Sequence, residues 1–436
     1  MRAVPLFFFV GFLFVYFDYA AAASLRLNVH SGGSADKVSV LVSPFRSSTV
    51  LERKIGLKCY EVVVNDLSSS GVFDVDYEIP YWLVAKEDIS NSSTDFMSSL
   101  KHDILITGNI SESSTARMRL SLFMLDVASG KELFGKSFNF EISNWRGAAH
   151  AISGEIYGRL TGDSGYFDSA VLYVAKSPTP NKICMMDSDG VNSTTIINSE
   201  ELVSSPNFLP GGQKIVYASN TLDKSEVLVH NLRTGESTSI GQLDGNISSA
   251  QPSPRGKRVL LSRVLDGRTD IYSLDIDGGQ FTKLTNGESV NTSASYSRDG
   301  RHIVFNSDRS GVPHLYVMNS DGSDQRRITS GNGMYASPLW SPRRDLIAFI
   351  KMEGGVYHIG IIGADGTGEK SLFKTTGSIE GLTWSPNGHV LLFVQKLDFD
   401  VPESEVHIVD LEGKDRKVTD IPVDISSPHW ARLLRD

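Results

Sequence analysis

Residues 130–137 are the part of this sequence that comes nearest to a nucleotide-binding motif. The stretch Gly130-Lys131-Glu132-Leu133-Phe134-Gly135-Lys136-Ser137 fits the phosphate-loop pattern G-x-x-x-x-G-K-[ST] in full. Such a loop binds phosphate because it follows a strand and opens a helix, whose N-terminal amides face the ligand. Residues 138–142 instead alternate like a second strand. We therefore expect Ser129–Lys131 to form a hairpin turn, and we expect no nucleotide site.

Other residues that could bind metal or catalyse a reaction do not have the required spacing. Two acidic turns, Asp187-Ser188-Asp189-Gly190 and Asp275-Ile276-Asp277-Gly278, look like fragments of a calcium loop. Each lacks the third acidic position and the downstream glutamate that calcium requires. The sequence contains no G-x-S-x-G, no H-E-x-x-H and no Cys/His metal spacing, and its ten histidines are scattered. We predict no enzyme activity, no metal and no cofactor.

The N-terminal residues have the composition of a secretory signal peptide. An apolar run from Ala3 to Phe17 follows Arg2 and precedes small residues that continue to Ser24. The run has about 15 residues, whereas a membrane span needs roughly 20. We therefore predict a signal peptide at residues 1–23 and a mature chain that begins at Ala22, Ala23 or Ser24. An uncleaved N-terminal anchor is the alternative.

Charge and cysteine content narrow the class of protein further. The net charge is -9 and no block of basic residues occurs, which argues against nucleic-acid binding because phosphate affinity comes from clustered lysine and arginine. The two cysteines, Cys59 and Cys184, fall in different expected domains. We expect each to be a buried apolar side chain and not half of a disulfide.

The elements that would hold any site are built on a repeat. Its clearest copy is Ser337-Pro338-Leu339-Trp340-Ser341-Pro342, and copies recur every 44 to 46 residues, centred on Phe208, Pro252, Tyr296, Trp340, Trp384 and Trp430. Turn glycines keep nearly the same period at Gly190, Gly235, Gly278, Gly322, Gly366 and Gly413. A strand-rich repeat of this length is typical of propeller blades, so we predict six blades of four strands.

The two ends of the repeat region predict how the ring closes. After Trp430 only six residues remain, enough for one strand. Strands are expected at Val171–Val174 and Ile183–Asp187, before the first complete repeat. We expect Ser427–Ala431 to supply the innermost strand of that blade, because closure leaves no free sheet edge. Between the third and fourth strands, acidic-glycine pairs such as Asp277-Gly278 are expected to turn because glycine accepts positive φ.

Residues 24–163 predict a compact α/β domain that precedes a propeller at residues 164–436. Segment 24–35 begins as a short strand, Leu25–His30, and becomes flexible in a glycine-serine run. The domain is expected to combine two or three helices with several strands. The expected helices are Leu51–Leu67, Thr94–Leu100 and Trp145–Leu160, the last ended by Gly162; the expected strands are Val38–Val42, Phe73–Tyr77, Asp103–Asn109, Arg117–Val127 and Leu133–Ile142.

This multidomain organisation, an N-terminal α/β domain followed by a six-bladed β-propeller closed by the C-terminal strand, resembles the TolB family. That family is the periplasmic component of the Tol-Pal system of Gram-negative bacteria. The resemblance covers nearly the whole mature chain. It is sharpest at residues 65–73, at residues 159–167 and in the Ser-Pro-x-Trp-Ser-Pro repeats.

The resemblance implies a periplasmic adaptor that is not an enzyme. Such an adaptor links the lipoprotein Pal at the outer membrane to the inner-membrane protein TolA. It maintains outer-membrane integrity and supports constriction at division. The implied TolA-binding segment is Ser24, Leu25, Arg26, Leu27, Asn28, Val29, His30 and Ser31. The implied Pal contacts, in loops that lead into the innermost strands, are Asn246, Ser249, Asn291 and Thr292; the first two depart from the family's residue types.

We also expect a monomer that meets membranes only through its partners and does not bind nucleic acid. The alternative function is a periplasmic propeller hydrolase or lyase that uses the central channel. That alternative requires polar or metal-binding side chains to converge on the channel.

Overall fold

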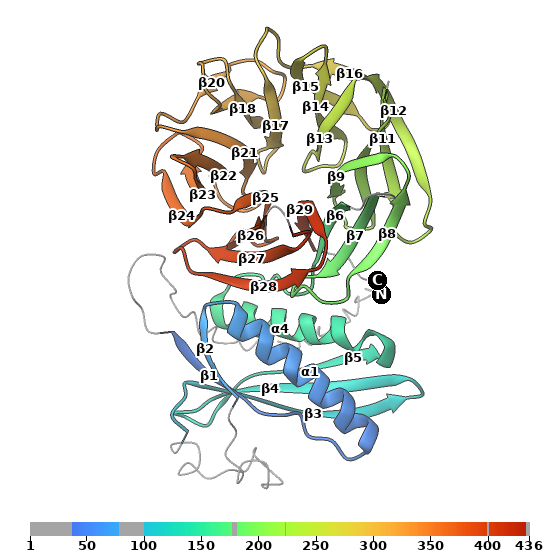
Figure 1. Cartoon of the computed structure of the whole chain (residues 1–436). Coiled ribbons are helices and arrows are strands. Elements are labelled where there is room, and N and C mark those ends of the chain that lie inside the picture. The colour runs from blue at the N-terminus through green and yellow to red at the C-terminus, as the bar shows by residue number, and fades with distance from the viewer. Residues whose placement is uncertain (1–36, 78–99, 177–180, 223, 399–400, 433–436) are drawn as a thin grey trace, which may run out of the picture.

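The computed structural model describes residues 37–77, 100–176, 181–222, 224–398 and 401–432. An α/β domain lies beside one edge of a propeller (Figure 1). The expected signal peptide, the strand Leu25–His30 and the TolA-binding segment fall outside the described residues. So does the helix expected over Thr94–Leu100, apart from its last residue.

The N-terminal domain is a five-stranded sheet with two α-helices packed on one face. The strand order is β2-β1-β3-β4-β5, with parallel pairing of β1 to β2 and β3 and antiparallel pairing onward. Alternate residues of β4 are buried under the helices, as period-two alternation requires. The strands are β1 (Val38–Val42), β2 (Phe73–Asp76), β3 (Ile104–Ser114), β4 (Arg117–Asp126) and β5 (Glu132–Glu141).

Helix α1 (Val50–Ser69) begins at a reciprocal N-terminal cap. The Thr49 hydroxyl accepts a hydrogen bond from the Glu52 amide at 3.2 Å, and the Glu52 carboxylate accepts one from the Thr49 amide at 2.9 Å. The same carboxylate accepts a bond from the Glu112 amide of β3 at 3.0 Å, which ties the helix start to the sheet. Cys59 lies on the buried face of α1, and both cysteines are free, as predicted.

Helix α4 (Trp145–Thr161) follows a short 3-10 turn, η1 (Ile142–Asn144), and ends at Gly162. Gly162 has φ 76°, a left-handed conformation that glycine adopts without strain. The hairpin between β4 and β5 turns at Gly130, and β5 follows it directly, so the phosphate-loop pattern lies on a strand pair as predicted. Neither described α-helix is long and apolar enough to cross a membrane.

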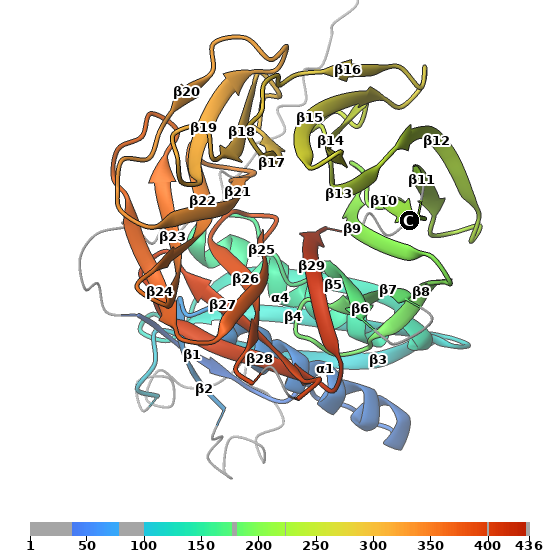
Figure 2. The same ribbon diagram turned by 45° about the horizontal axis from the view of Figure 1, so that its top comes forward.

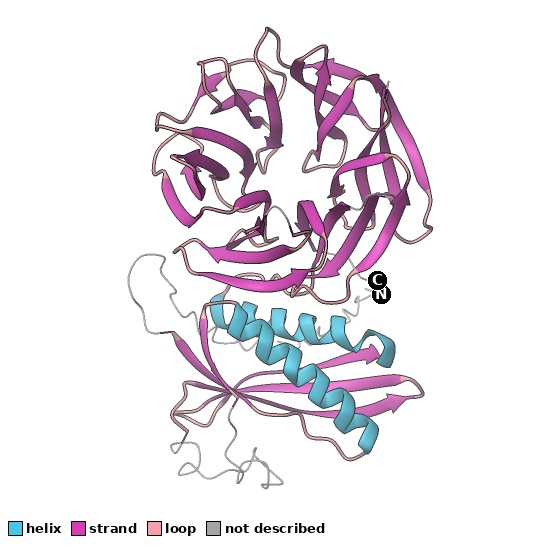
Figure 3. Ribbon diagram, viewed as in Figure 1, coloured by secondary structure: helices cyan, strands magenta, loops and turns pink. Residues whose placement is uncertain are grey.

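The propeller has six four-stranded antiparallel blades around a central axis (Figure 2), and all its regular elements are strands (Figure 3). Its strands in chain order are β6 (Ala170–Lys176), β7 (Asn181–Asp187), β8 (Thr194–Ser199), β9 (Leu202–Phe208), β10 (Lys214–Asn220), β11 (Lys224–Asn231), β12 (Ser237–Asp244), β13 (Asn246–Pro252), β14 (Arg258–Leu265), β15 (Arg268–Asp275), β16 (Phe281–Lys283) and β17 (Asn291–Tyr296). They continue with β18 (His302–Ser307), β19 (His314–Asn319), β20 (Arg326–Arg327), β21 (Met334–Trp340), β22 (Leu346–Glu353), β23 (Val356–Gly363), β24 (Lys370–Thr375), β25 (Ser378–Trp384), β26 (Val390–Lys396), β27 (Ser404–Asp410), β28 (Asp415–Ile421) and β29 (Asp424–Ala431).

The ring closes as predicted, because β29 is the innermost strand of the sheet β29-β6-β7-β8. Trp430 pairs with Val171 in the register of that sheet. The Trp430 indole also donates to the Ser169 hydroxyl at 2.7 Å. The last strand of the chain is thus held by the first strand of the propeller and by the segment just before it.

One predicted turn differs in detail. After β15 the positive φ falls on Gly279 (63°), not on Gly278. The Asp275 carboxylate accepts hydrogen bonds from the amides of Asp277 (3.0 Å) and Gly278 (2.9 Å), which holds those residues in a right-handed turn. The second glycine therefore takes the left-handed position. The other five turn glycines of the repeat have positive φ as expected.

The two domains share one hydrophobic core. It continues from β1 and α1 through α4 into the blades next to the closing strand. A chain of edge-to-face aromatic contacts crosses it: Phe73 on Tyr157 at 5.9 Å, Tyr157 on Tyr166 at 6.3 Å, and Tyr166 on Trp430 at 5.3 Å. The domain boundary expected at residues 163 and 164 falls in the segment that joins α4 to β6.

Replacing Trp430 with alanine is expected to destabilise the protein by ~3–5 kcal/mol, because it removes a buried indole that joins the closing strand to both domains. Trp430→Phe keeps an aromatic ring but loses the bond to Ser169, and should destabilise less. Guanidinium unfolding monitored by circular dichroism measures the free energy of unfolding of both variants. An unchanged midpoint for Trp430→Ala would contradict the assigned role.

Candidate functional site

The propeller has two chemically different ends. The six innermost strands run through the ring in the same sense, so all begin at one end, the first mouth, and end at the other, the second mouth. Turns between second and third strands also reach the first mouth. Turns between first and second strands, and between third and fourth strands, reach the second mouth. Loops of this kind present binding residues on a rigid scaffold.

The first mouth collects most of the large apolar side chains that the propeller exposes. Nine such residues are exposed among the described residues of the propeller, and eight of them lie at this end. We call these eight the apolar rim: Leu202, Leu222, Val290, Val312, Met334, Leu397, Val401 and Val423. The ninth, Val191, lies in a turn at the second mouth. Exposed apolar side chains gathered on one surface indicate a protein-binding site.

The four predicted Pal contacts lie at the same end, but inside the innermost strands and not in the loops before them. Asn246 is the exposed first residue of β13, and Asn291 and Thr292 open β17. The strands begin earlier than expected because each pairs with its neighbour up to the mouth. The Ser249 hydroxyl donates to the Ser262 hydroxyl at 2.6 Å, and Ser262 also accepts from the Ser293 amide at 3.1 Å. Through Ser262, the structure therefore brings the predicted contacts of β13, Asn246 and Ser249, close to those of β17, Asn291 and Thr292.

Asn291 is buried and holds an arginine that the sequence did not indicate. Its side-chain oxygen accepts a hydrogen bond from Arg309 at 2.8 Å. The same guanidinium donates to the Ser307 hydroxyl at 3.0 Å and lies 4.8 Å from the ring centre of Tyr316. Asn291 thus positions Arg309 beside the first mouth. Nothing in the spacing of Arg309 from Asn291 identified this pairing.

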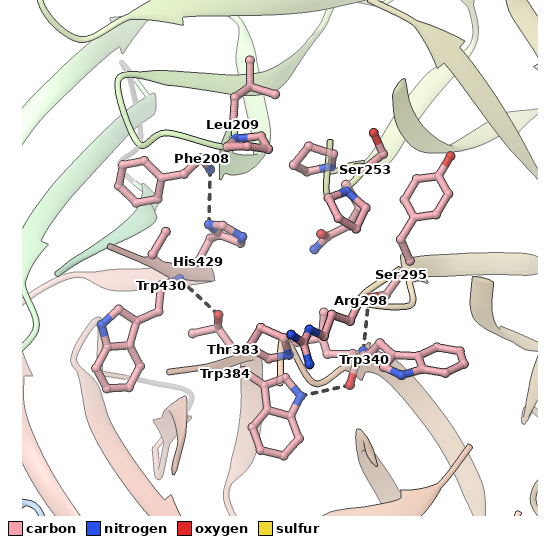
Figure 4. Close-up of a pocket in the computed structure, with 18 of the residues that line it drawn as sticks. Phe208, Leu209, Ser253, Ser295, Arg298, Trp340, Thr383, Trp384, His429 and Trp430 are labelled. Atoms are coloured by element: carbon pink, nitrogen blue, oxygen red, sulfur yellow. Dashed lines mark hydrogen bonds between the residues drawn. The ribbon is translucent and has the colours of Figure 1, made fainter. Parts of the chain in front are cut away.

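The channel narrows to a cavity of about 320 Å³ at the second mouth (Figure 4). Its walls are linked from blade to blade by one recurring hydrogen bond. At three of the six junctions the residue before one repeat centre accepts a bond from the backbone amide of the next centre: Ser295 from Trp340 (3.2 Å), Thr383 from Trp430 (3.1 Å), and His429 from Phe208 (3.2 Å). The last bond joins the final repeat to the first.

His429 faces this cavity as a neutral imidazole. Burial lowers the pKa of His429 to about 4. Its Nδ1 accepts the Phe208 amide proton, so Nε2 carries the imidazole proton. The cavity lining contains Arg298 and Arg432 but no carboxylate. This lining can donate hydrogen bonds and attract negative charge.

A buried charge network joins the two domains away from the channel. The His150 Nδ1 of α4 lies 2.8 Å from the Asp66 carboxylate of α1. On its other side, His150 Nε2 lies 3.9 Å from Asp189 and 4.0 Å from Asp187, both of the propeller. Arg146 pairs with Asp187 at 2.9 Å and also with Asp189. The network therefore connects both helices to the end of β7 and the turn that follows it.

Asp66, His150 and Asp189 each place one potential metal-ligand atom within 4.8 Å of the others. The Arg146 guanidinium already occupies the position of a cation between Asp187 and Asp189, and His150 Nδ1 is engaged by Asp66. We therefore describe the group as a charge network. Sequence reasoning treated Asp187–Gly190 as a turn alone; only the packing of α4 against it shows the interdomain role.

Protonation of this network depends on burial and on its carboxylates. Burial lowers the pKa of His150, but the hydrogen bond to Asp66 and the nearby carboxylates outweigh burial and raise that pKa above its usual 6.5. Burial also raises the pKa of Asp66, against the effect of His150. Both groups hold a proton more tightly in the folded protein than in the unfolded chain.

Two family models match the chain. The model described as the TolB amino-terminal domain matches residues 25–133, and the model described as the TolB beta propeller domain matches residues 157–434. The crystal structure of TolB from Acinetobacter baumannii is similar with a TM-score of 0.80 and 25% identity, covering 91% of this chain and 97% of that chain.

Two curated relatives are similar in sequence over part of their length. The Tol-Pal system protein TolB of Anaplasma marginale (strain St. Maries) is 44% identical over 227 residues, which are 52% of this chain and 51% of the relative. The Tol-Pal system protein TolB of Wolbachia pipientis wMel is 32% identical over 241 residues, 54% of each. In these matches the chain spans about half the length of the curated relatives.

The charge network predicts a pH dependence of stability. Groups whose pKa is raised on folding stabilise the folded state at low pH, and that stabilisation is lost as pH rises. The melting temperature should therefore fall from pH 6.5 upward, through the raised pKa of His150. His150→Gln should flatten this fall. His302→Gln, at an exposed position at the start of β18, should leave it unchanged. Equal slopes for wild type and His150→Gln in differential scanning fluorimetry would refute the assignment.

Proposed function

The chain belongs to the TolB family, and on that premise we propose that it is a periplasmic adaptor of the Tol-Pal system. In this proposal it binds the lipoprotein Pal at one end and the inner-membrane protein TolA at the other. Linking the two membranes in this way would maintain outer-membrane integrity and support outer-membrane constriction during division. The signal peptide expected at residues 1–23 would bring the chain to the periplasm.

The apolar rim is the observation that carries the Pal part of the proposal. Burying Leu222 or Leu397 against a partner removes apolar area from water, which contributes ~1.5–3 kcal/mol for a fully buried side chain. The rim residues come from several blades, so a globular partner seated on the axis would cover them together.

The predicted Pal contacts also favour the first mouth as the Pal-binding surface. Asn246 is exposed and Thr292 half-buried at the starts of β13 and β17, at the same end of the ring as the apolar rim. Asn291 would act indirectly, by holding Arg309, because its own side chain is buried and hydrogen-bonded. We propose Asn246, Ser249 and Thr292 as direct contacts and Asn291 as a positioning residue.

The position of the N-terminal domain leaves the first mouth open. That domain packs against second-mouth turns: His389 lies 2.5 Å from Asp163, and Arg146 pairs with the end of β7 and the turn after it. These contacts lie at the second mouth, so we propose that a partner on the first mouth would leave them uncovered. Pal and TolA would then use separate surfaces, as an adaptor between two membranes requires.

For TolA we propose the segment Ser24–Ser31, which alternates like a strand in the sequence. An extended segment of this kind binds by adding a strand to the open edge of a partner's sheet. The glycine-serine residues that follow would let the segment reach the partner while the domain stays in place.

The alternative of a channel enzyme has little support. General acid–base chemistry or metal ligation at the channel would need carboxylates or clustered ligands there. The cavity lining has neither, and the group of potential metal-ligand atoms lies between the domains.

Charge placed in the apolar rim should weaken Pal binding. The double variant Leu222→Asp/Val312→Asp is expected to lower affinity for the soluble domain of Pal at least about tenfold, since both apolar contacts are lost. Val191→Asp, an exposed apolar residue of the second mouth, is the matched control and should bind like wild type. Isothermal titration calorimetry measures the Pal affinity of wild type, the double variant and the control. Wild-type affinity of a folded rim variant would rule out this surface.

Deleting Ser24–Ser34 should abolish TolA binding and leave Pal binding intact or stronger. The deletion removes the proposed added strand but no described residue of either domain. Calorimetric titration with the soluble domain of TolA tests it. Unchanged TolA affinity would show that another surface is used.

A further inference from the structure

A ring of basic side chains surrounds the second mouth. Among the described residues, the turns between the first and second strands of the blades, with the residues next to them, contribute seven arginines and two lysines. The carboxylates there are Asp299 and Asp345 in the turns, and Asp163 and Asp168 in the segment that leads into β6. We call the nine basic residues the basic ring: Lys214, Arg255, Lys257, Arg258, Arg298, Arg301, Arg343, Arg344 and Arg432. All are exposed except Arg344, which is half-buried. This contrasts with the net charge of -9 for the whole chain.

The turns that carry the basic ring lie against one another. A Cβ placed on Gly256 would stand 3.1 Å from Pro210 of the preceding turn, and one on Gly300 would stand 3.7 Å from Pro254. A Cβ on Gly388 would stand 3.2 Å from Arg343. Neighbouring turns of the ring therefore touch at three of its junctions, although its residues are spread from 214 to 432 in the sequence. Arg298 and Arg432 also line the 320 Å³ cavity at its centre, and Figure 4 shows Arg298 there.

Most charges of the basic ring have no direct ion-pair partner among the described residues. The ion pairs of those residues include one member of the ring, Arg301, which lies 3.8 Å from Asp299. Arg344 contacts the His389 imidazole at 3.2 Å, and Arg432 donates to the Gly165 carbonyl. Asp163 is the nearby carboxylate: it lies 2.5 Å from His389, and although burial raises its pKa, His389 and the charge of Arg343 help to lower that pKa below its usual value. Like charges gathered without partners repel one another and attract an anionic ligand.

The outer edge of the same end has the opposite charge. The turns between third and fourth strands carry exposed acidic residues, including Glu236, Asp277, Asp321, Asp324, Asp365 and Glu412. A broad polyanion, such as duplex nucleic acid or an anionic membrane, would place its phosphates over these carboxylates as well as over the ring. A narrow anionic chain would meet the ring alone.

We infer that the second mouth binds an extended acidic segment of a polypeptide, with carboxylates on the basic ring and one apolar side chain in the cavity. Arginine, which supplies seven of the nine charges, suits this ligand because its planar guanidinium pairs with a carboxylate through two hydrogen bonds. The cavity is lined by proline and aromatic residues, with the His429 Nε2–H as a donor. This surface is distinct from the apolar rim and does not depend on Pal binding there.

The test uses the full mature chain and a fluorescein-labelled heptapeptide with a central tryptophan and glutamate at every other position. Fluorescence anisotropy should show binding that weakens as salt is raised, because exposed charges are screened. The same peptide with glutamine in place of glutamate should bind at least about tenfold more weakly, since charge-assisted bonds are stronger than neutral ones.

Charge reversal in the ring is the decisive comparison. Arg298→Glu/Arg343→Glu should lower affinity for the glutamate peptide at least about tenfold. Arg53→Glu/Arg233→Glu makes the same change in net charge at exposed sites outside the ring and should stay within about threefold of wild type. Both side chains of the ring variant are exposed, so folding should persist, and circular dichroism checks it.

Three results would overturn the inference: no binding of the glutamate peptide to wild type, equal binding of the glutamine peptide, or equal loss in the two double variants. Tighter binding of a short DNA duplex, or of phosphatidylglycerol vesicles, than of the peptide at equal salt would also overturn it, by showing a different class of ligand.

Discussion

Closure of the ring by the last strand is the constraint on which the rest of the structure depends. Without β29 the inner edge of β6 would be unpaired, and the cavity wall would lack His429 and Trp430. Pairing of β29 with β6 completes the last blade, and the bond from the Phe208 amide to His429 joins the last repeat to the first. The mouths exist as continuous surfaces only after this step, because each is assembled from turns of successive blades.

The closing strand also fixes the position of the N-terminal domain. The aromatic chain from Phe73 to Trp430 passes from the first domain through the linking segment into the ring. The network around His150 joins the same partners by charge. A domain held by a shared core and a buried charge network does not swing freely. Binding at the propeller could therefore influence the N-terminal domain through displacement of packed elements.

The two mouths use different chemistry for recognition. At the first mouth, exposed apolar side chains provide binding free energy through burial, which suits a folded partner. At the second mouth, arginines around a small cavity favour a thin, negatively charged chain. The N-terminal domain sits beside the second mouth, so a ligand there would lie close to the interdomain contact. One rigid disc can in this way present two separate binding surfaces.

The sequence by itself determined the blade count, the closing strand, the main helices and hairpin of the N-terminal domain, and the family. These follow from the repeat period of about 44 residues, from the alternation of apolar and polar residues along strands, and from residues that end helices. Each of these signals is local or recurs at a constant interval. The tertiary structure decided the rest: that Asn291 holds Arg309, that Gly279 and not Gly278 takes the left-handed turn, and that His150 bridges two domains. The tertiary structure also decided which residues meet at each mouth, because the apolar rim and the basic ring each take single residues from distant repeats. No window of the sequence contains such a surface, because ring closure brings its residues together.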